Sequence, residues 1–287
     1  MPYASARDGT KLYFEAAGRG TPIVFVHEFS GDHRSWEAQM RHFARRYRCI
    51  AFNTRGYPPS DVPKACAKYS QPIVIDDVAA VMQHLELRKA HIVGCSMGAR
   101  TSLGFALTYP TRCWSVTTVG AGAGSNPATR AAFLRNTEAN ARRFLALGVP
   151  ATLRISSVAA GRIPQMNKDP RGFTEFRRWQ MEHSALGLAN TQRGVQLKRA
   201  TIFELGSALR KMKVPLFVVS GDEDDNCVAP ALFMKSQCKA ARLWICPATG
   251  HTVNTEEPDL FNQMLGDFLG QVDSGRWRAR DPRSIVR

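Results

Sequence analysis

The feature that most constrains the fold is a regular alternation of short apolar segments and amphipathic segments. Residues 22–27 (PIVFVH) form a continuous apolar run, which is typical of a strand buried on both faces. Residues 73–87 place apolar side chains at three- and four-residue steps, which is typical of a helix packed on such a sheet. This order predicts an α/β fold, a mostly parallel, doubly wound sheet with helices on both faces. Strands are predicted also at 11–16, 49–52, 91–93, 114–119, 214–220 and 242–246, and helices at 36–47, 97–109, 231–238 and 259–269.

The alternation is interrupted once. Between residues 125 and 213 the chain is helix-prone, rich in arginine and broken by prolines, with no convincing strand. We therefore expect residues 1–124 and 214–273 to form one core domain, interrupted by a helical insertion at residues 125–213. Within this insertion, residues 187–190 (GLAN) are interpreted as a bend before a helix returns to the core. Residues 274–287 have no periodicity and are expected to form a loose, basic C-terminal tail.

The net charge of +15 is concentrated in the insertion. Residues 125–213 hold 16 Lys and Arg against 5 Asp and Glu, and residues 274–287 hold 5 against 1, whereas the core is balanced at 18 against 18. The basic residues are not interleaved with an aromatic stacking platform, so we expect no nucleic-acid partner. A basic insertion favours an anionic substrate. The alternative is that these arginines are only solvated or face a subunit partner; the sequence gives no oligomeric state.

Other classes of protein are excluded by what the chain lacks. No apolar run approaches the roughly 18 residues of a membrane-spanning helix, and the N-terminus carries no apolar signal-peptide core. The seven cysteines form no C-x-x-C pair, so neither a disulfide framework nor a metal site is expected. No dinucleotide or flavin fingerprint occurs, so no cofactor is expected. We predict a cytoplasmic protein with reduced thiols and no membrane partner.

A G-x-S-x-G motif, Gly94–Gly98, follows the predicted strand at 91–93 and opens the next helix. A hydroxyl nucleophile requires a tight strand-to-helix turn that exposes it at the end of the sheet, and the glycines prevent collisions with neighbouring elements. The N-terminus of the helix also favours developing negative charge there. We therefore predict that Ser96 is a catalytic nucleophile. A nucleotide-binding turn is the alternative, but no G-x-G-x-x-G or G-x-x-x-x-G-K-[ST] pattern lies near the first turn.

A serine nucleophile requires a base, and the base requires an acid that orients it. The predicted strand at 214–220 runs into Gly-Asp-Glu-Asp-Asp, and the strand at 242–246 runs into Pro-Ala-Thr-Gly-His. Both segments follow the carboxyl ends of strands, where open α/β sheets place their ligands. His251 is therefore the predicted base. The acid stays open on this argument, because residues 222–225 are four consecutive acidic residues.

Five motifs together resemble the α/β-hydrolase-fold serine hydrolases, in particular the capped esterases and lactonases. They are VFVHEFSGDHRSW, NTRGYPPSD, VGCSMG, VVSGDEDD and PATGHTVNTEEPDLF, and they cover the whole predicted core. The resemblance implies that residues 125–213 form a helical cap over the core, inserted after the sixth strand. It also implies that Asp224 is the acid, with Asp222 holding the turn and Asp225 as the fallback. The implied oxyanion hole comprises the backbone N–H groups of Phe29 and Met97.

The chain departs from the family pattern at Glu28, where members usually have glycine. A carboxylate beside an oxyanion hole opposes the developing negative charge unless it is paired or points away. We expect the Glu28 side chain to point outward or to bond Arg34 or His33. The alternative is that Glu28 is substrate-proximal and positions water or a cationic group. In the cap, Trp179 is one of several aromatic side chains that are candidates for contact with substrate.

The resemblance implies hydrolysis of a carboxylic ester or lactone, a small molecule, through an acyl-enzyme on a Ser–His–Asp triad. A carbon–carbon bond hydrolase is the first alternative, although those enzymes commonly carry Trp after the histidine and this chain has Thr252. A cofactor-free haloperoxidase shares a similar S-M-G elbow and also stays open. A non-enzymatic ligand-binding member of the fold is a more distant alternative, because all three triad candidates are present. The acyl group, the leaving group and the physiological substrate are not specified by these motifs.

Overall fold

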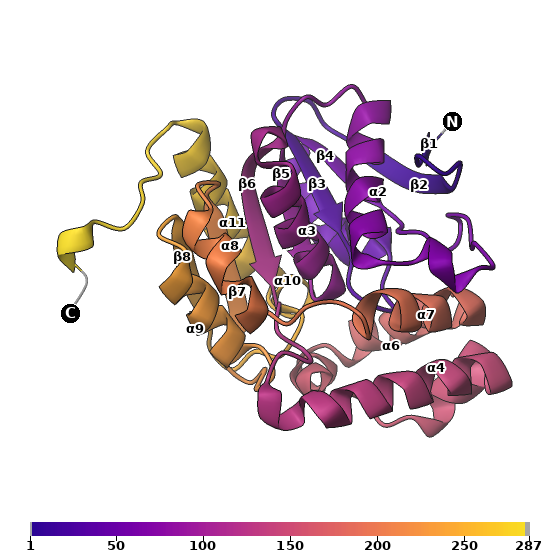
Figure 1. Ribbon diagram of the computed structural model, residues 1–287. Coiled ribbons are helices and arrows are strands. Elements are labelled where there is room, and N and C mark those ends of the chain that lie inside the picture. Colours follow the sequence, from indigo (N-terminus) through magenta and orange to yellow (C-terminus); the bar gives the residue numbers. More distant parts are fainter. Residues whose placement is uncertain (1, 285–287) are drawn as a thin grey trace.

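The computed structural model describes residues 2–284, and within them the core is a single eight-stranded sheet (Figure 1). The strand order is β1-β2-β4-β3-β5-β6-β7-β8, with β1 and β2 antiparallel to their neighbours and every later pair parallel. The mostly parallel sheet predicted from the sequence is confirmed. The strands are β1 Tyr3–Ser5, β2 Lys11–Ala17, β3 Pro22–Val26, β4 Arg48–Phe52, β5 Ala90–Cys95, β6 Cys113–Val119, β7 Leu216–Gly221 and β8 Ala241–Cys246.

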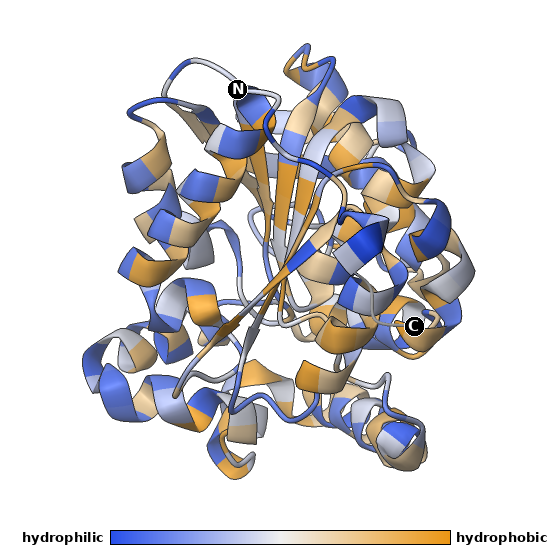
Figure 2. Cartoon of the chain, turned by 90° about the vertical axis from the view of Figure 1, so that its left-hand side faces the viewer, coloured by the Kyte–Doolittle hydropathy of each residue, from blue (hydrophilic) through white to orange (hydrophobic). Residues whose placement is uncertain are grey.

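Helices cover both faces of the sheet because the strands are apolar on both sides. Along β3, Val24 and Val26 enter one apolar cluster while Ile23 and Phe25 enter the other, as the two-residue period of a strand requires. Figure 2 shows these strands as an apolar centre between helices on which hydrophilic and hydrophobic segments alternate. One layer comprises α2 Gln71–His84, α3 Met97–Thr108, α8 Gly206–Lys211 and α9 Val228–Gln237, and the other α1 Glu37–Phe43 and α11 Pro258–Asp273.

The insertion after β6 forms a helical cap at the carboxyl end of the parallel strands (Figure 1). Its longest helix, α4, is kinked at Gly148, whose φ of 74° lies in the left-handed region that favours glycine. Two further cap helices begin at side-chain caps, because Asp169 accepts from the N–H of Gly172 and Ser184 from that of Gly187. The cap helices are α4 Pro127–Ile155, α5 Ile163–Lys168, α6 Pro170–Met181, α7 Ala185–Thr191 and a π-helical turn Gln192–Gln196.

The bend expected at residues 187–190 is wrong, because these residues lie inside α7. Gly187 is helical, and glycine serves there for a packing reason. A Cβ atom on Gly187 would lie 1.8 Å from the carbonyl oxygen of Gly56, so the missing side chain lets α7 approach the core backbone closely. A glycine is typical both of a turn and of a close contact between a helix and another backbone, so Gly187 alone did not distinguish the two.

The cap ends before residue 213. Ile202, Leu209 and Met212 join the apolar cluster that includes the sheet, and α8 packs against α9 of the core. The start of the tail is also attached, since the Trp277 ring packs on Phe268 and its Nε1–H donates to the Ala240 carbonyl. The last residues of the predicted tail, 285–287, lie outside the described residues.

Short elements complete the loops around the sheet. They are 3-10 turns at His33–Trp36, Cys66–Lys68, Pro110–Arg112, Ala160–Arg162, Phe203–Leu205 and Pro282–Ser284, and helix α10 Val253–Glu256.

Within residues 2–284, no single helix is long and apolar enough to cross a membrane. One bent pair, Pro127–Ile155 with Ala160–Lys168, meets that requirement only by combined length and composition.

Candidate active site

Ser96 lies at the turn between β5 and α3, where the sequence motif predicts it. Its φ of 53° is in the left-handed region, which costs a non-glycine residue backbone strain and is the conformation of a nucleophile elbow. The flanking glycines make the turn possible. A Cβ on Gly94 would lie 2.3 Å from the Gly98 carbonyl oxygen, and one on Gly98 would lie 2.0 Å from that of Val26. The motif therefore reflects the packing of α3 against β5 and β3.

The structure brings the three predicted triad residues together. His251 Nε2 lies 2.8 Å from Ser96 Oγ, and His251 Nδ1 lies 2.6 Å from Asp224 Oδ2. The acid follows β7 and the histidine follows β8, so all three groups project from the carboxyl ends of parallel strands. Asp222 instead accepts from the N–H of Thr249, which ties the acid loop to the histidine loop.

The cap also holds the histidine loop. The backbone N–H of His251 donates to the carbonyl oxygen of Gly161, at 2.7 Å. A Cβ on Gly161 would lie 3.0 Å from the Cβ of His251, a contact tight enough to force the loop to shift. The position of the imidazole therefore depends on a cap residue that carries no side chain.

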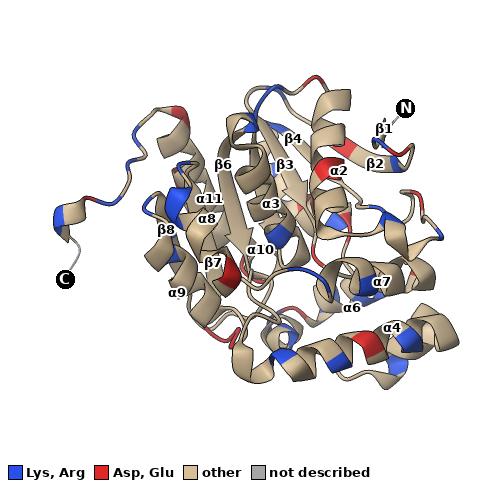
Figure 3. Ribbon diagram, in the orientation of Figure 1, with Lys and Arg blue, Asp and Glu red and all other residues tan. Residues whose placement is uncertain are grey.

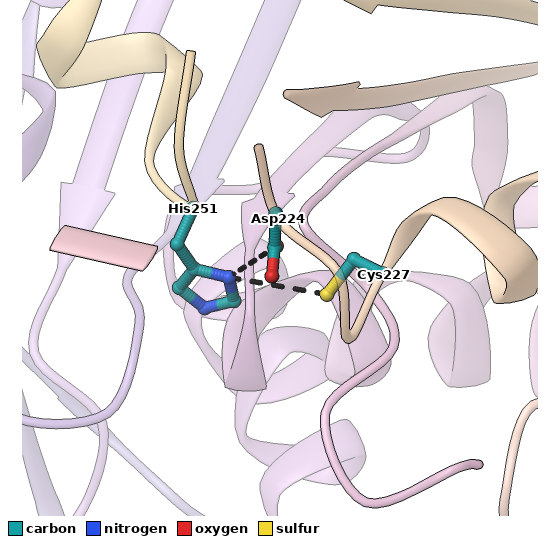
Figure 4. A group of neighbouring side chains, drawn as sticks. All are labelled: Asp224, Cys227 and His251. Carbon is teal, nitrogen blue, oxygen red and sulfur yellow. Dashed lines mark hydrogen bonds and ion pairs between the residues drawn. The ribbon is translucent and has the colours of Figure 1, made fainter. Parts of the chain in front are cut away.

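Cys227 stands beside the acid and the base, and the sequence motifs do not identify it. Its Sγ lies 3.9 Å from His251 Nδ1, and the three side chains converge between the loops that follow β7 and β8 (Figure 4). Burial works to raise the pKa of Asp224, but the charge of His251 and hydrogen bonds from His251 and Cys227 hold that pKa below its usual value.

Asp224, Cys227 and His251 each offer one potential metal-ligand atom, all within 4.8 Å of one another. A metal-binding cysteine is a thiolate, whereas burial raises the pKa of the Cys227 thiol well above its usual value. His251 Nδ1 also faces the carboxylate at hydrogen-bond distance. The cluster is therefore better explained as a hydrogen-bonded acid loop than as a metal centre.

The two predicted oxyanion donors lie next to the nucleophile. Met97 is the first residue of α3, and Phe29 follows β3, the strand adjacent to β5. Within residues 2–284, neither backbone N–H donates a hydrogen bond to another group of the chain. Two free amides on adjacent loops beside a serine hydroxyl form the kind of donor pair that binds a carbonyl oxygen as it gains negative charge.

Glu28 is paired, but not with the expected partners. Its side chain is buried, at 2% exposure, and its Oε1 lies 3.0 Å from Nη2 of Arg162 and accepts from the Ser35 hydroxyl. Arg34 instead binds Asp32 and Glu182, so the expected bond to Arg34 is wrong. The outward orientation is also wrong, because the pair lies between the loop after β3 and the cap.

Arg162 also lies at this site, and sequence reasoning did not identify it. Besides Glu28, its guanidinium donates to Gln165 and to Thr252, the residue after His251, and lies 4.1 Å from the ring centre of Phe176. It therefore connects the oxyanion loop, the histidine loop and the cap. No local signal could have found this contact, because Glu28 and Arg162 are 134 residues apart in the sequence.

A cavity of about 360 Å³ lies between the triad and the cap. Ser96, His251 and Glu28 line its core side, and Phe144, Leu153, Phe173 and Phe176 line its cap side. Trp179 does not line it, which corrects the expectation of substrate contact: its ring packs under the Arg34 guanidinium, 5.1 Å away. Volume alone does not identify the site, since a groove of about 600 Å³ beside Trp114 lies far from the triad.

The architecture and the elbow at the end of β5 are those of the α/β hydrolases. The chain belongs to the α/β-hydrolase-fold family, whose pattern matches residues 21–258, and it is a hydrolase of that superfamily.

Known proteins resemble the chain over nearly its whole length. A putative 2-succinyl-6-hydroxy-2,4-cyclohexadiene-1-carboxylate synthase of Bacillus subtilis (strain 168) is 25% identical over 263 residues, 90% of this chain and 93% of the relative. A thermophilic esterase from Thermogutta terrifontis is 22% identical, with a TM-score of 0.81 over 94% of this chain and 98% of that one. The enol-lactonase from Burkholderia xenovorans LB400 is 23% identical, with a TM-score of 0.78 over 94% of this chain and 100% of that one.

Proposed function

We propose that this protein hydrolyses a carboxylic ester or lactone through an acyl-enzyme at Ser96. The observation that carries the proposal is the continuous hydrogen-bonded series from Asp224 through His251 to Ser96, which ends beside two free backbone amides. A hydroxyl, a base, an orienting acid and an oxyanion site together are what acyl transfer requires.

In the first half-reaction, Ser96 Oγ attacks the carbonyl carbon while His251 Nε2 accepts its proton. The amides of Phe29 and Met97 stabilise the oxyanion, and His251 then returns the proton to the leaving alkoxide. In the second half-reaction, His251 activates a water that attacks the acyl-enzyme, and Ser96 leaves as the protonated hydroxyl. Asp224 accepts from Nδ1–H throughout, which keeps Nε2 directed at Ser96.

The names of the similar proteins alone do not decide the reaction. They include a putative synthase as well as an esterase and an enol-lactonase, all on the same fold. Cleavage of a carbon–carbon bond uses the same triad, so the β-diketone class belongs among the substrates tested. A cofactor-free haloperoxidase activity and a binding role without turnover are further outcomes.

The experiment is a screen of p-nitrophenyl esters of graded chain length, enol-lactones and β-diketones against the wild type and Ser96→Ala. We expect turnover of at least one ester or lactone class, with loss of the acyl-enzyme and a roughly 10³-fold or greater fall in kcat in the variant. Labelling of Ser96 by a fluorophosphonate reports nucleophile reactivity even where the right acyl group is missing. No labelling and no turnover in the wild type would overturn the proposal.

A further inference from the structure

Among the charged side chains that line the cavity, one positive charge has no negative partner in the lining. Glu28 is paired with Arg162, and Asp224 is paired with His251. The remaining charged residue of the lining is Arg177, on α6. Its two hydrogen-bond acceptors are both neutral, since Nη1 donates to Oε1 of Gln180 at 3.2 Å and Nη2 to the Leu153 carbonyl at 2.7 Å.

The surroundings of Arg177 make this imbalance costly. The side chain is half-buried, and burial lowers the pKa of its guanidinium, with no charged neighbour among residues 2–284 contributing. Apolar side chains of Phe144, Leu153 and Phe173 line the same cavity, so the local dielectric is low and a nearby opposite charge would be strongly favoured. Some other cap arginines have carboxylate partners, as Arg193 has in Glu138, whereas Arg130 and Arg199 also bind only carbonyl oxygens among the described residues.

Arg177 also has donors to spare. A guanidinium carries five N–H groups, and within residues 2–284 two of them are used. The three remaining N–H donors lie in a planar, fixed geometry. A carboxylate, with its two oxygens and its negative charge, is a better partner for them than a neutral acceptor.

We propose that Arg177 binds a carboxylate of the substrate, so that the substrate is an ester or lactone that carries a second, ionised carboxyl group. This inference rests on the proposed hydrolase function and narrows its substrate class. The proposal assigns recognition of the substrate carboxylate to a single cap residue, Arg177. It is therefore distinct from the general excess of basic residues, which is spread over the whole cap (Figure 3).

The test compares p-nitrophenyl monoesters of dicarboxylic acids of four to six carbons with neutral p-nitrophenyl esters of the same chain lengths. Arg177→Met is measured beside Arg178→Met, which removes the same charge from the adjacent, exposed position of the same helix. We expect Arg177→Met to lower kcat/KM for the anionic esters about 10- to 100-fold and to change the neutral esters less than about threefold. Arg178→Met should change both by less than about threefold.

The neutral esters also report whether each variant folds, so a general loss is distinguished from a specific one. Equal losses in the Arg177 and Arg178 variants would assign the effect to diffuse cap charge and overturn the site. Equal effects of Arg177→Met on anionic and neutral esters would overturn it as well. Arg177→Lys keeps the charge without the planar donor set, and we expect it to restore only part of the lost kcat/KM.

A binding measurement separates this inference from the proposed function. In the Ser96→Ala background, calorimetric titration with glutarate mono-anilide and with neutral valeranilide requires no turnover. We expect the anionic anilide to bind the Ser96→Ala protein when Arg177 is intact. Adding Arg177→Met should weaken its affinity about 10-fold or more, and adding Arg178→Met should not weaken it. Equal binding of the two anilides to the Ser96→Ala protein would overturn the carboxylate site even where ester hydrolysis is established.

Discussion

Glu28 Oε1 and Arg162 Nη2 lie 3.0 Å apart and join the loop after β3 to the cap. The pair is almost fully buried, with side-chain exposures of 2% and 11%, and it borders the amide of Phe29 that is proposed to bind the oxyanion. A carboxylate at this position would by itself oppose charge development in the transition state. Arg162 neutralises it and, through Thr252, contacts the histidine loop. The glutamate is thus tolerated because the cap supplies its counter-ion.

The pair should behave as a unit. We expect Arg162→Met to reduce the rate of fluorophosphonate labelling of Ser96 by about 10- to 100-fold and to lower the free energy of unfolding by about 3–5 kcal/mol, because it leaves a buried carboxylate unpaired. Glu28→Gln with Arg162→Met should recover most of both losses. Labelling rates and urea unfolding curves of the four proteins complete the cycle, and a double variant no better than Arg162→Met would contradict the charge-balance explanation.

The acid of the triad can be distinguished from its neighbour by one pair of substitutions. Asp224→Asn should lower kcat by up to about 10⁴-fold, because an amide in place of the carboxylate no longer holds the His251 tautomer that directs Nε2 toward Ser96. Asp225→Asn, at the exposed next position, should leave kcat within about threefold. Steady-state kinetics with any ester that the wild type hydrolyses measures kcat for both variants. A large effect at Asp225 with none at Asp224 would reassign the acid.

Local patterns in the sequence predicted what is local in the structure. Apolar runs and helical spacing located the strands and core helices, and the loops after β5 and β8 located Ser96 and His251 because parallel strands end at one edge. The loop after β7 left four consecutive acidic residues open, and only the family resemblance selected Asp224 among them. The short edge strand β1 was not predicted, since three residues carry no period.

Contacts between cap and core could not be predicted in the same way. The helical period shows that α6 has an apolar face, but it does not show whether that face is directed at the cavity or at the other cap helices. In the structure, Phe173, Phe176 and Gln180 face the cavity at three- and four-residue steps, and Trp179 falls on an adjacent side against Arg34. The partner of Glu28 depends on how the cap docks, which is a tertiary property with no sequence period.

Cys227 is expected to act on the reaction through Asp224. Its thiol lies beside the triad and helps to hold the pKa of Asp224 below its usual value. Cys227→Ala removes that donor, so the pKa of Asp224 rises. The more basic carboxylate stabilises the protonated ring of His251 more strongly, and the acid side of the pH–rate profile therefore moves to higher pH, with a few-fold loss of kcat. Cys227→Ser retains a donor and should keep the wild-type profile. Identical profiles for the alanine and wild-type proteins would show that the thiol only fills space.

His183 should make the stability of the fold depend on pH. It is a buried cap residue whose Nε2 lies 3.2 Å from the Ser30 carbonyl and whose ring packs against Tyr57. Burial is the largest cause that lowers the pKa of His183, to about 4 from 6.5, with opposing contributions from Asp32 and the Ser30 hydrogen bond and lowering ones from His27 and Arg34. The folded protein therefore holds this imidazole neutral across a range in which the unfolded chain binds a proton.

Because the unfolded state binds more protons between pH 6.5 and about 4, the free energy of unfolding falls as the pH falls through that window. The contribution of His183 is complete above pH 6.5, and about 2 kcal/mol of it is lost by pH 5. His183→Gln keeps an N–H donor for Ser30 but does not titrate, so its stability should decrease less than that of the wild type between pH 7.5 and 5. His42→Gln, at an exposed site, is the matched control and should follow the wild-type curve. Urea unfolding at four pH values measures the difference, and parallel curves for the wild type and His183→Gln would show that His183 does not titrate in this window.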